Sequence, residues 1–340
     1  MNGVLKKSNG FAVAVFSVSL LSLFHGSVYA DECPSEDFAQ FLPAFSANAE
    51  TQQRLTAMTV KSQVLKPVGG HGVFEPQTTG VNSSNLAFPL MAPVATDKTE
   101  GVEVEAIDDS HFNVVDKRTG NSNIKIFNFS RQACWVLEGV EDWSISEKDL
   151  VAASKPSMSI AENLCFQRAV AYEGLGGLEQ YRLTGELFEA SLENYLCAAA
   201  SGDPQASLNA ASLSLSGMAS QLETEKVEAL FKAAATTLAD GAASLSTFYC
   251  YGNNTAAEGP CQHPEQAEKE LIRAASMGSA DAMNYLGYSF ETGELVTKDL
   301  SKALACYRLA ADKGNDTALN NLNRLKTQAA EANQASSHCY

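Results

Sequence analysis

The chain has 340 residues, of which 45% are hydrophobic and 19% are charged, and its formal net charge is -16. Such an acidic excess repels phosphate backbones and anionic membrane surfaces, which argues against a nucleic-acid-binding protein. It favours a basic partner, or simply an acidic surface that water solvates.

Residues 1–30 are typical of a signal peptide. Lys6 and Lys7 precede an apolar run over residues 11–24, and residues 28–30 supply the small side chains that a signal peptidase recognises. The run is shorter than a bilayer-spanning helix requires. We expect cleavage after Ala30, and Cys33 lies too far from that point to accept a lipid anchor.

Removal of this segment leaves 22 basic and 40 acidic residues, and no later segment is long and apolar enough to cross a membrane. We therefore expect a soluble protein that is periplasmic or secreted, with no membrane insertion after cleavage.

Residues 31–152 are predicted to form an α+β domain that begins with two helices. Ser35 is a candidate N-cap of the first helix and Ser46 of a second helix that reaches Leu55. The first helix carries an apolar stripe made of Phe38, Phe41, Leu42 and Phe45. Glycine, proline and small polar residues over 67–72 and 78–84 predict a long loop after the helices.

Alternating apolar and polar residues then predict strands at 102–106, 112–116, 124–129 and 135–140, with a turn at 119–121. The expected architecture is two helices followed by a curved antiparallel sheet. Charged and small residues from Ser144 to Pro156 mark the end of this domain.

This domain resembles the small envelope domains of nuclear-transport-factor-2-like shape, through the helix from Asp37 to Phe45 and the run from Phe127 to Trp143. The resemblance implies a cone-shaped domain, a shape that serves enzymes, ligand pockets and dimer modules alike. A deep apolar pocket bounded by Phe127, Phe129 and Trp135 would favour a small-ligand or dimerisation role.

The remainder of the chain carries an internal repeat with a period of 36 residues. Six positions recur at this distance: Ala274, Ala275, Gly278, Ala282, Asn284 and Leu286 return as Ala310, Ala311, Gly314, Ala318, Asn320 and Leu322. Each unit is predicted to be a pair of amphipathic helices, and periods of this size indicate stacked helical hairpins. Gly287 would let a neighbouring helix approach, and Gly314 is placed for a left-handed C-terminal cap.

Two weaker copies precede these, with steps of 36 residues from Ala198 to Ala234 and 40 residues from Ala234 to Ala274. The extra four residues fall in the turn-rich loop over 250–261. A further pair of helices is predicted over 158–200, with its first helix ending at Tyr172 and Gly174.

The order of landmarks in these units resembles the Sel1-like repeat, a relative of the tetratricopeptide repeat. In chain order the landmarks are an alanine pair, glycine, alanine, Leu-Gly, an aromatic residue, glycine, Val-x-Lys-Asp, Lys-Ala and Tyr-Arg-x-Ala-Ala. The resemblance covers about residues 158–326. It implies an all-α solenoid over 156–326, followed by a polar tail over 327–340, that acts as an interaction scaffold.

All eight cysteines follow the predicted cleavage point, and an even number in an oxidising compartment indicates disulfides. Eight cysteines allow on the order of one hundred pairings, among which sequence alone does not choose. Cys250 with Cys261 is favoured because it would close the inserted loop. Nearness in the chain suggests the remaining pairs: Cys33 with Cys134, Cys165 with Cys197, and Cys306 with Cys339.

No catalytic set, cofactor motif or metal-ligand spacing is found, so no catalytic residue, cofactor or metal site is predicted. His111 beside Asp108 and Asp109 could act as a general base in a pocket, but an exposed turn histidine is the simpler interpretation. Some cysteine-rich Sel1-like relatives bind penicillin and are weak β-lactamases. Their constant cysteine spacing within each repeat is not reproduced here, so whether the chain is an enzyme stays open.

Binding is the favoured function. The first helices of the repeats should line one wall of the solenoid, which we call the inner wall and assign to Asn284, Tyr285, Tyr288, Asn320 and Asn321. A protein or peptide scaffold of the cell envelope is therefore expected. The alternatives are a binder or weak hydrolase of cell-wall-derived ligands, and a small-ligand or dimerisation role of the first domain. Asn320 and Asn321 could instead cap or solvate a terminal helix.

Overall fold

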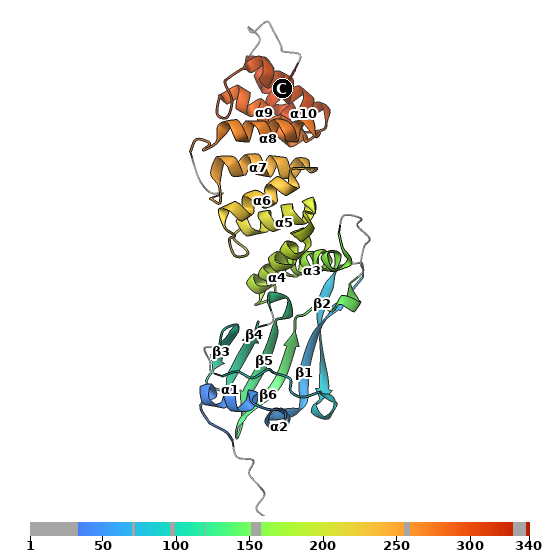
Figure 1. Ribbon diagram of the computed structural model, residues 1–340, viewed down its shortest axis with the longest axis vertical. Coiled ribbons are helices and arrows are strands. Elements are labelled where there is room, and N and C mark those ends of the chain that lie inside the picture. Colours follow the sequence, from blue (N-terminus) through green and yellow to red (C-terminus); the bar gives the residue numbers. More distant parts are fainter. Residues whose placement is uncertain are drawn as a thin grey trace, which may run out of the picture.

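A computed structural model describes residues 33–69, 72–95, 99–118, 120–150, 158–254, 259–328 and 338–340. The molecule is elongated, with a β-sheet domain at one end and a stack of helices at the other (Figure 1). An N-terminal α+β domain followed by an all-α repeat region is thus confirmed. The predicted signal peptide and most of the predicted tail lie outside the described residues.

The N-terminal domain combines two short helices with one six-stranded sheet in the order β2-β1-β6-β5-β4-β3. Its elements are α1 (Phe38–Ser46), α2 (Ala49–Arg54), β1 (Thr56–Pro67), β2 (Phe74–Asn82), β3 (Val102–Asp108), β4 (His111–Asp116), β5 (Lys125–Arg131) and β6 (Trp135–Asp142). The sheet is mixed, because β1 pairs in parallel with β6. The expectation of a purely antiparallel sheet was wrong, since this pairing joins strands far apart in the chain and no local pattern reveals it.

The predicted helix caps were also wrong. Asp37 caps α1 by accepting a hydrogen bond from the Gln40 amide at 3.0 Å, and Asn48 caps α2 through the Thr51 amide at 2.8 Å. Aspartate and asparagine serve this role as well as serine does. Ser46 instead ends α1 and donates a hydrogen bond to a backbone carbonyl.

The long loop expected over 67–84 is instead the end of a β-hairpin. β1 and β2 pair from Thr59 with Asn82 to Pro67 with Phe74. Most β2 side chains are exposed, so the apolar alternation that identifies a half-buried strand is missing from this edge of the sheet. Pro67 is tolerated because it stands at the end of its strand.

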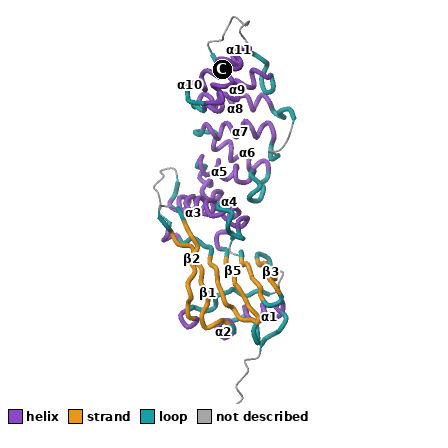
Figure 2. Tube along the Cα trace, turned by 180° about the vertical axis from the view of Figure 1, so that it is seen from behind, coloured by secondary structure: helices purple, strands orange, loops and turns teal. Residues whose placement is uncertain are grey.

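Nine helices follow within the described residues, and they pack in sequential pairs from the sheet outward (Figure 2). They are α3 (Ile160–Gly177), α4 (Thr184–Ala198), α5 (Pro204–Leu215), α6 (Thr224–Ala234), α7 (Ala239–Tyr251), α8 (Pro264–Ser276), α9 (Ala280–Thr292), α10 (Leu300–Asp312) and α11 (Asp316–Gln328). The predicted end of the first helix was wrong, because α3 continues through Tyr172 and Gly174 to Gly177. Gly314 has the left-handed φ of +88° expected of a cap.

The sheet and the first helical pair share one hydrophobic core. Val115 and Ile126 of the sheet, with Ile124 just before β5, pack with Tyr172 of α3 and Leu187 of α4. Polar contacts surround this core: the Glu193 carboxylate accepts hydrogen bonds from the backbone amide and hydroxyl of Ser122 at 3.2 and 3.1 Å. The sheet therefore covers the end of the helical stack, which would otherwise expose apolar surface.

Gly287 shows how closely the repeat helices approach. A Cβ atom at this position of α9 would lie 2.6 Å from Cδ1 of Tyr307 on α10. We expect Gly287→Ala to lower the free energy of unfolding by about 1–3 kcal/mol, because the buried Tyr307 ring would have to move. Gly174→Ala is the matched control: no atom lies within 4 Å of its Cβ position. That change should stabilise the helix by about 0.5–1 kcal/mol. Equal midpoints in urea denaturation for both variants would contradict this packing.

Candidate functional site

Four of the five predicted inner-wall residues form two contacting pairs. On α9, the rings of Tyr285 and Tyr288 are nearly parallel with centroids 6.3 Å apart, and 42% of Tyr288 is exposed. The Asn321 side chain of α11 donates a hydrogen bond to Asn284 at 3.1 Å. Asn320 is exposed and makes no hydrogen bond to the other four within the described part of the chain.

The wall continues onto α7 through a pair of tyrosines. Burial, the neighbouring Tyr251 and Glu294 raise the pKa of Tyr285 to about 12. Its phenol therefore stays protonated and can donate a hydrogen bond across the neutral pH range. Tyr251 ends α7, so the contact between Tyr251 and Tyr285 joins the wall to the preceding repeat.

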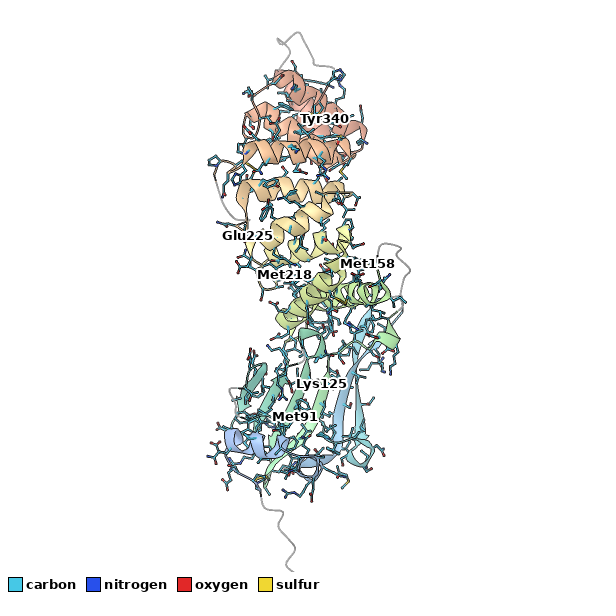
Figure 3. The ribbon with its side chains drawn as sticks, viewed as in Figure 1. Met91, Lys125, Met158, Met218, Glu225 and Tyr340 are labelled. Carbon is cyan, nitrogen blue, oxygen red and sulfur yellow. A yellow bond between two sulfur atoms is a disulfide. The ribbon has the colours of Figure 1, made fainter. Side chains whose placement is uncertain are left out.

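Two adjoining hollows extend the wall toward the sheet, and we call them together the groove. The first, of about 290 Å³, lies between α5 and α7 and is lined by Ser212, Leu215, Ser216, Phe231, Ser244, Thr247, Phe248, Tyr251 and Gly252. The second, of about 460 Å³, lies between α3 and α5 and is lined by Glu173, Gly177, Glu179, Phe188, Asn209, Ser212, Leu213, Ser216 and Met218. Ser212 and Ser216 belong to both. Figure 3 shows Met218 beside the turn that follows α5.

Sequence reasoning missed the groove, although the repeat spacing contained a signal for it. Phe248 and Ser212 occupy the positions equivalent to Tyr288, 40 and then 36 residues earlier. Because the wall had been assigned only in the two clearest repeats, these positions were not considered.

A charged network joins α9, α10 and α11. The guanidinium of Arg324 donates to both carboxylate oxygens of Glu291, at 2.6 and 2.7 Å, and the Tyr307 hydroxyl donates to the same carboxylate at 2.8 Å. The hydrogen bonds from Arg324 hold the pKa of Glu291 below its ordinary value, against the effect of burial. A bidentate pair of this kind fixes α11 against α9.

We expect Arg324→Met to lower the free energy of unfolding by about 0.5–1 kcal/mol at neutral pH, because 45% of the arginine side chain is exposed and solvent screens the pair. Since the pKa of Glu291 is depressed in the folded state, the stabilisation is present above the ordinary value of 4.5 and is lost as pH falls through the folded value. Urea denaturation across the acidic range measures the difference in the free energy of unfolding between the native chain and Arg324→Met, with Arg308→Met on α10 as control. A difference that persists in acid would contradict the ion-pair account.

Aromatic rings from α1 fill the space between Phe127, Phe129 and Trp135. Phe38 and Phe45 pack edge-on against Phe129, with centroids 5.3 and 5.0 Å apart. All three predicted lining residues are at most 2% exposed. The deep pocket that would favour a small-ligand or dimerisation role is therefore not formed by these residues, whose aromatic rings belong to the core.

A hollow of about 390 Å³ does lie beside Phe127, next to Arg118 and Lys125. Arg118 donates to the Asp116 carboxylate and to the carbonyl oxygens of Ala92 and Pro93, and Lys125 lies 3.2 Å from an Asp142 oxygen. Each cation is therefore already paired.

His111 is the first residue of β4 and directly follows an exposed turn. Its Nδ1 lies 2.9 Å from the Asp108 carboxylate and 3.0 Å from the Ser110 hydroxyl, and about half of its side chain is exposed. Hydrogen bonds from Ser110 and His111 lower the pKa of Asp108 to about 2. Both partners contact the same ring nitrogen, so they are not arranged as a nucleophile, base and orienting acid. Groups of side chains suited to a metal are absent from the described ranges.

The structure joins the eight cysteines in four disulfides, and these are the four pairs that the sequence suggested: Cys33–Cys134, Cys165–Cys197, Cys250–Cys261 and Cys306–Cys339. One lies in the sheet domain, one joins α3 to α4, one closes the inserted loop, and one ties the C-terminal end to α10.

The paired helices define an α-solenoid repeat protein joined to a mixed-sheet domain. Residues 280–315 match the model of the Sel1 repeat, so the chain carries a Sel1 repeat. Sel1 repeats generally serve as protein–protein interaction scaffolds. No curated protein matches the chain in sequence. No helix in the described ranges has the length and apolar character needed to cross a bilayer.

Several solved structures are similar to the chain. A Sel1 repeat protein from Oxalobacter formigenes is 27% identical over 39% of this chain and 97% of its own, with a TM-score of 0.33. The protective antigen c5321 of uropathogenic Escherichia coli, which has an SLR fold, is 23% identical over 50% of this chain and 37% of its own, with a TM-score of 0.37. Cysteine-rich protein B of Helicobacter pylori is 19% identical over 41% and 96%, with a TM-score of 0.32. All three TM-scores lie below 0.5, so these structures say nothing about what this chain binds.

Proposed function

We propose that the protein is an exported scaffold of the cell envelope that binds a peptide or protein segment along the inner wall and the groove. The observation that carries this proposal is the continuity of the surface: the groove leads from α3 and α5 to Tyr251 on α7, and Tyr251 meets Tyr285 on α9. Tyrosine offers a large contact area at a low cost in side-chain entropy, and such side chains are frequent in binding sites.

The chemistry of this surface fits a polypeptide ligand. Side-chain hydroxyls and amides of Ser212, Thr247, Asn209 and Asn321 can hydrogen-bond the backbone of an extended segment. The four disulfides suit an oxidising compartment, which supports the envelope location.

Affinity capture from a cell-envelope extract tests the proposal. The bait is the oxidised chain, compared with a wall variant that combines Tyr285→Ala, Tyr288→Ala and Asn321→Ala. A control variant combines Lys269→Ala and Arg308→Ala, which are exposed on the second helices α8 and α10. We expect one protein to be recovered near stoichiometry by the native chain and the control, and to be lost with the wall variant.

Thermal unfolding must first show that the wall variant stays folded, because Asn321→Ala removes the hydrogen bond to Asn284. Equal recovery by the wall variant and the native chain would contradict a binding role of this surface.

A further inference from the structure

The groove has an apolar part that the last repeat lacks. In the hollow between α5 and α7, Leu215, Phe231 and Tyr251 form the lining together with Phe248. In the last repeat the positions of Leu215 and Phe231 are taken by Glu291 and Tyr307, both 76 residues later, which is two repeat steps of 40 and 36 residues.

That substitution changes the character of the surface. The Tyr307 hydroxyl donates a hydrogen bond to the Glu291 carboxylate, and Arg324 donates hydrogen bonds to the same carboxylate. At the equivalent place the described side chains of Leu215 and Phe231 are apolar, and they line an open hollow together with serine and threonine residues. Burial of an apolar group of a ligand there would remove that surface from water.

The adjoining hollow is acidic. Glu173 and Glu179 line it, and neither forms an ion pair with another described residue. Glu173 accepts a hydrogen bond from the Tyr195 hydroxyl at 2.5 Å, which directs its carboxylate. No lysine, arginine or histidine is among the described residues that line either hollow. Met218, 52% exposed, adds a flexible apolar side chain to the rim.

We propose that the groove binds an extended segment of a partner protein in which a large apolar residue neighbours a lysine or arginine. The apolar side chain enters the hollow between α5 and α7, and the basic side chain pairs with Glu173 and Glu179. This inference rests on the proposed function and names its ligand class. The apolar contact supplies most of the affinity, while the two carboxylates, which form no ion pair with another described residue, select the charge of the ligand.

A displayed library of random linear peptides, selected on the oxidised full chain, provides the probe. We expect the enriched peptides to carry lysine or arginine close to a large apolar residue. Fluorescence anisotropy with one enriched peptide then measures the affinity of the groove for that peptide. Ser212 is exposed and lines both hollows, so Ser212→Trp should fill them and weaken binding by about tenfold or more.

The double variant Glu173→Gln and Glu179→Gln keeps an acceptor for Tyr195 and removes only the charge. We expect it to weaken binding by about tenfold. Added salt should weaken the native complex and have little effect on this variant, because salt screens exposed charges. Arg308→Trp on α10 and Glu225→Gln on α6 are the matched controls and should bind as the native chain does (Figure 3 labels Glu225).

Enrichment of acidic or uncharged peptides would overturn this inference, and so would binding that Ser212→Trp leaves unchanged. If such peptides still lose affinity with the wall variant at Tyr285, Tyr288 and Asn321, the proposed scaffold function stands and only the ligand class is wrong. Failure to enrich any peptide, together with no captured protein, would count against both.

Discussion

Tyr172→Ala is expected to lower the free energy of unfolding by about 3–5 kcal/mol, because it empties the core that joins the sheet to the helices. Tyr172 is fully buried on α3. Its hydroxyl donates to the Ser122 carbonyl at 2.7 Å and accepts from the Ile145 amide at 3.2 Å. Burial raises the pKa of this phenol well above its ordinary value, so the hydroxyl keeps the proton that it donates.

Tyr172→Phe separates packing from hydrogen bonding. The ring remains and only the hydroxyl is lost, so we expect a loss of about 1–3 kcal/mol, the cost of leaving buried polar groups unpaired. Urea denaturation gives both values, and amide hydrogen exchange shows where the protein opens. For Tyr172→Ala, exchange should rise in the sheet as well as in α3 and α4. A rise confined to the helices would show that the two parts fold independently.

The repeat region could be predicted from the sequence because its information is local. A helical period of apolar residues and a repeat of 36 residues fix which helices pair and which faces are buried. The end of α3 was misplaced because Gly174 was taken as a stop signal. In the structure no atom lies near its Cβ position and the helix passes through it, as an exposed helix tolerates at a modest cost.

The sheet could be predicted only in part. Strands β3 to β6 were found because apolar and polar residues alternate in their sequences, although only β6 alternates regularly in burial. Most side chains of β2 are exposed at the edge of the sheet, so its sequence carries no such pattern. The parallel pairing of β1 with β6 brings together residues as distant as Thr56 and Leu137, and nothing local indicates it. The groove was missed for a related reason: Phe231 and Phe248 look like core residues in the sequence, and only the packing shows that a hollow lies between them and Ser212.

Replacing both Cys33 and Cys134 by serine is expected to cost more than replacing any other disulfide pair, about 4–5 kcal/mol. The bond links residues separated by 101 positions, and the chain-entropy account gives larger stabilisation to longer loops. It ties the segment before α1 to the turn before β6, where Trp135 donates its indole hydrogen bond to the Glu36 carbonyl at 2.9 Å. Loss of the disulfide therefore frees the start of the chain from the sheet.

The pair Cys250 and Cys261 is the matched control, with a separation of 11 positions and an expected loss of about 3 kcal/mol. Urea denaturation of both double-serine variants should give that order, with α1 the first element to exchange when Cys33 and Cys134 are replaced. The opposite order would mean that the disulfide of the inserted loop between α7 and α8 stabilises the fold by more than the entropy of loop closure predicts.

Under a thiol reductant the native protein should lose more stability than either variant does, because it has more disulfides to lose. Four disulfides whose stabilisation is lost under reducing conditions are compatible with a protein that lies outside the reducing cytosol.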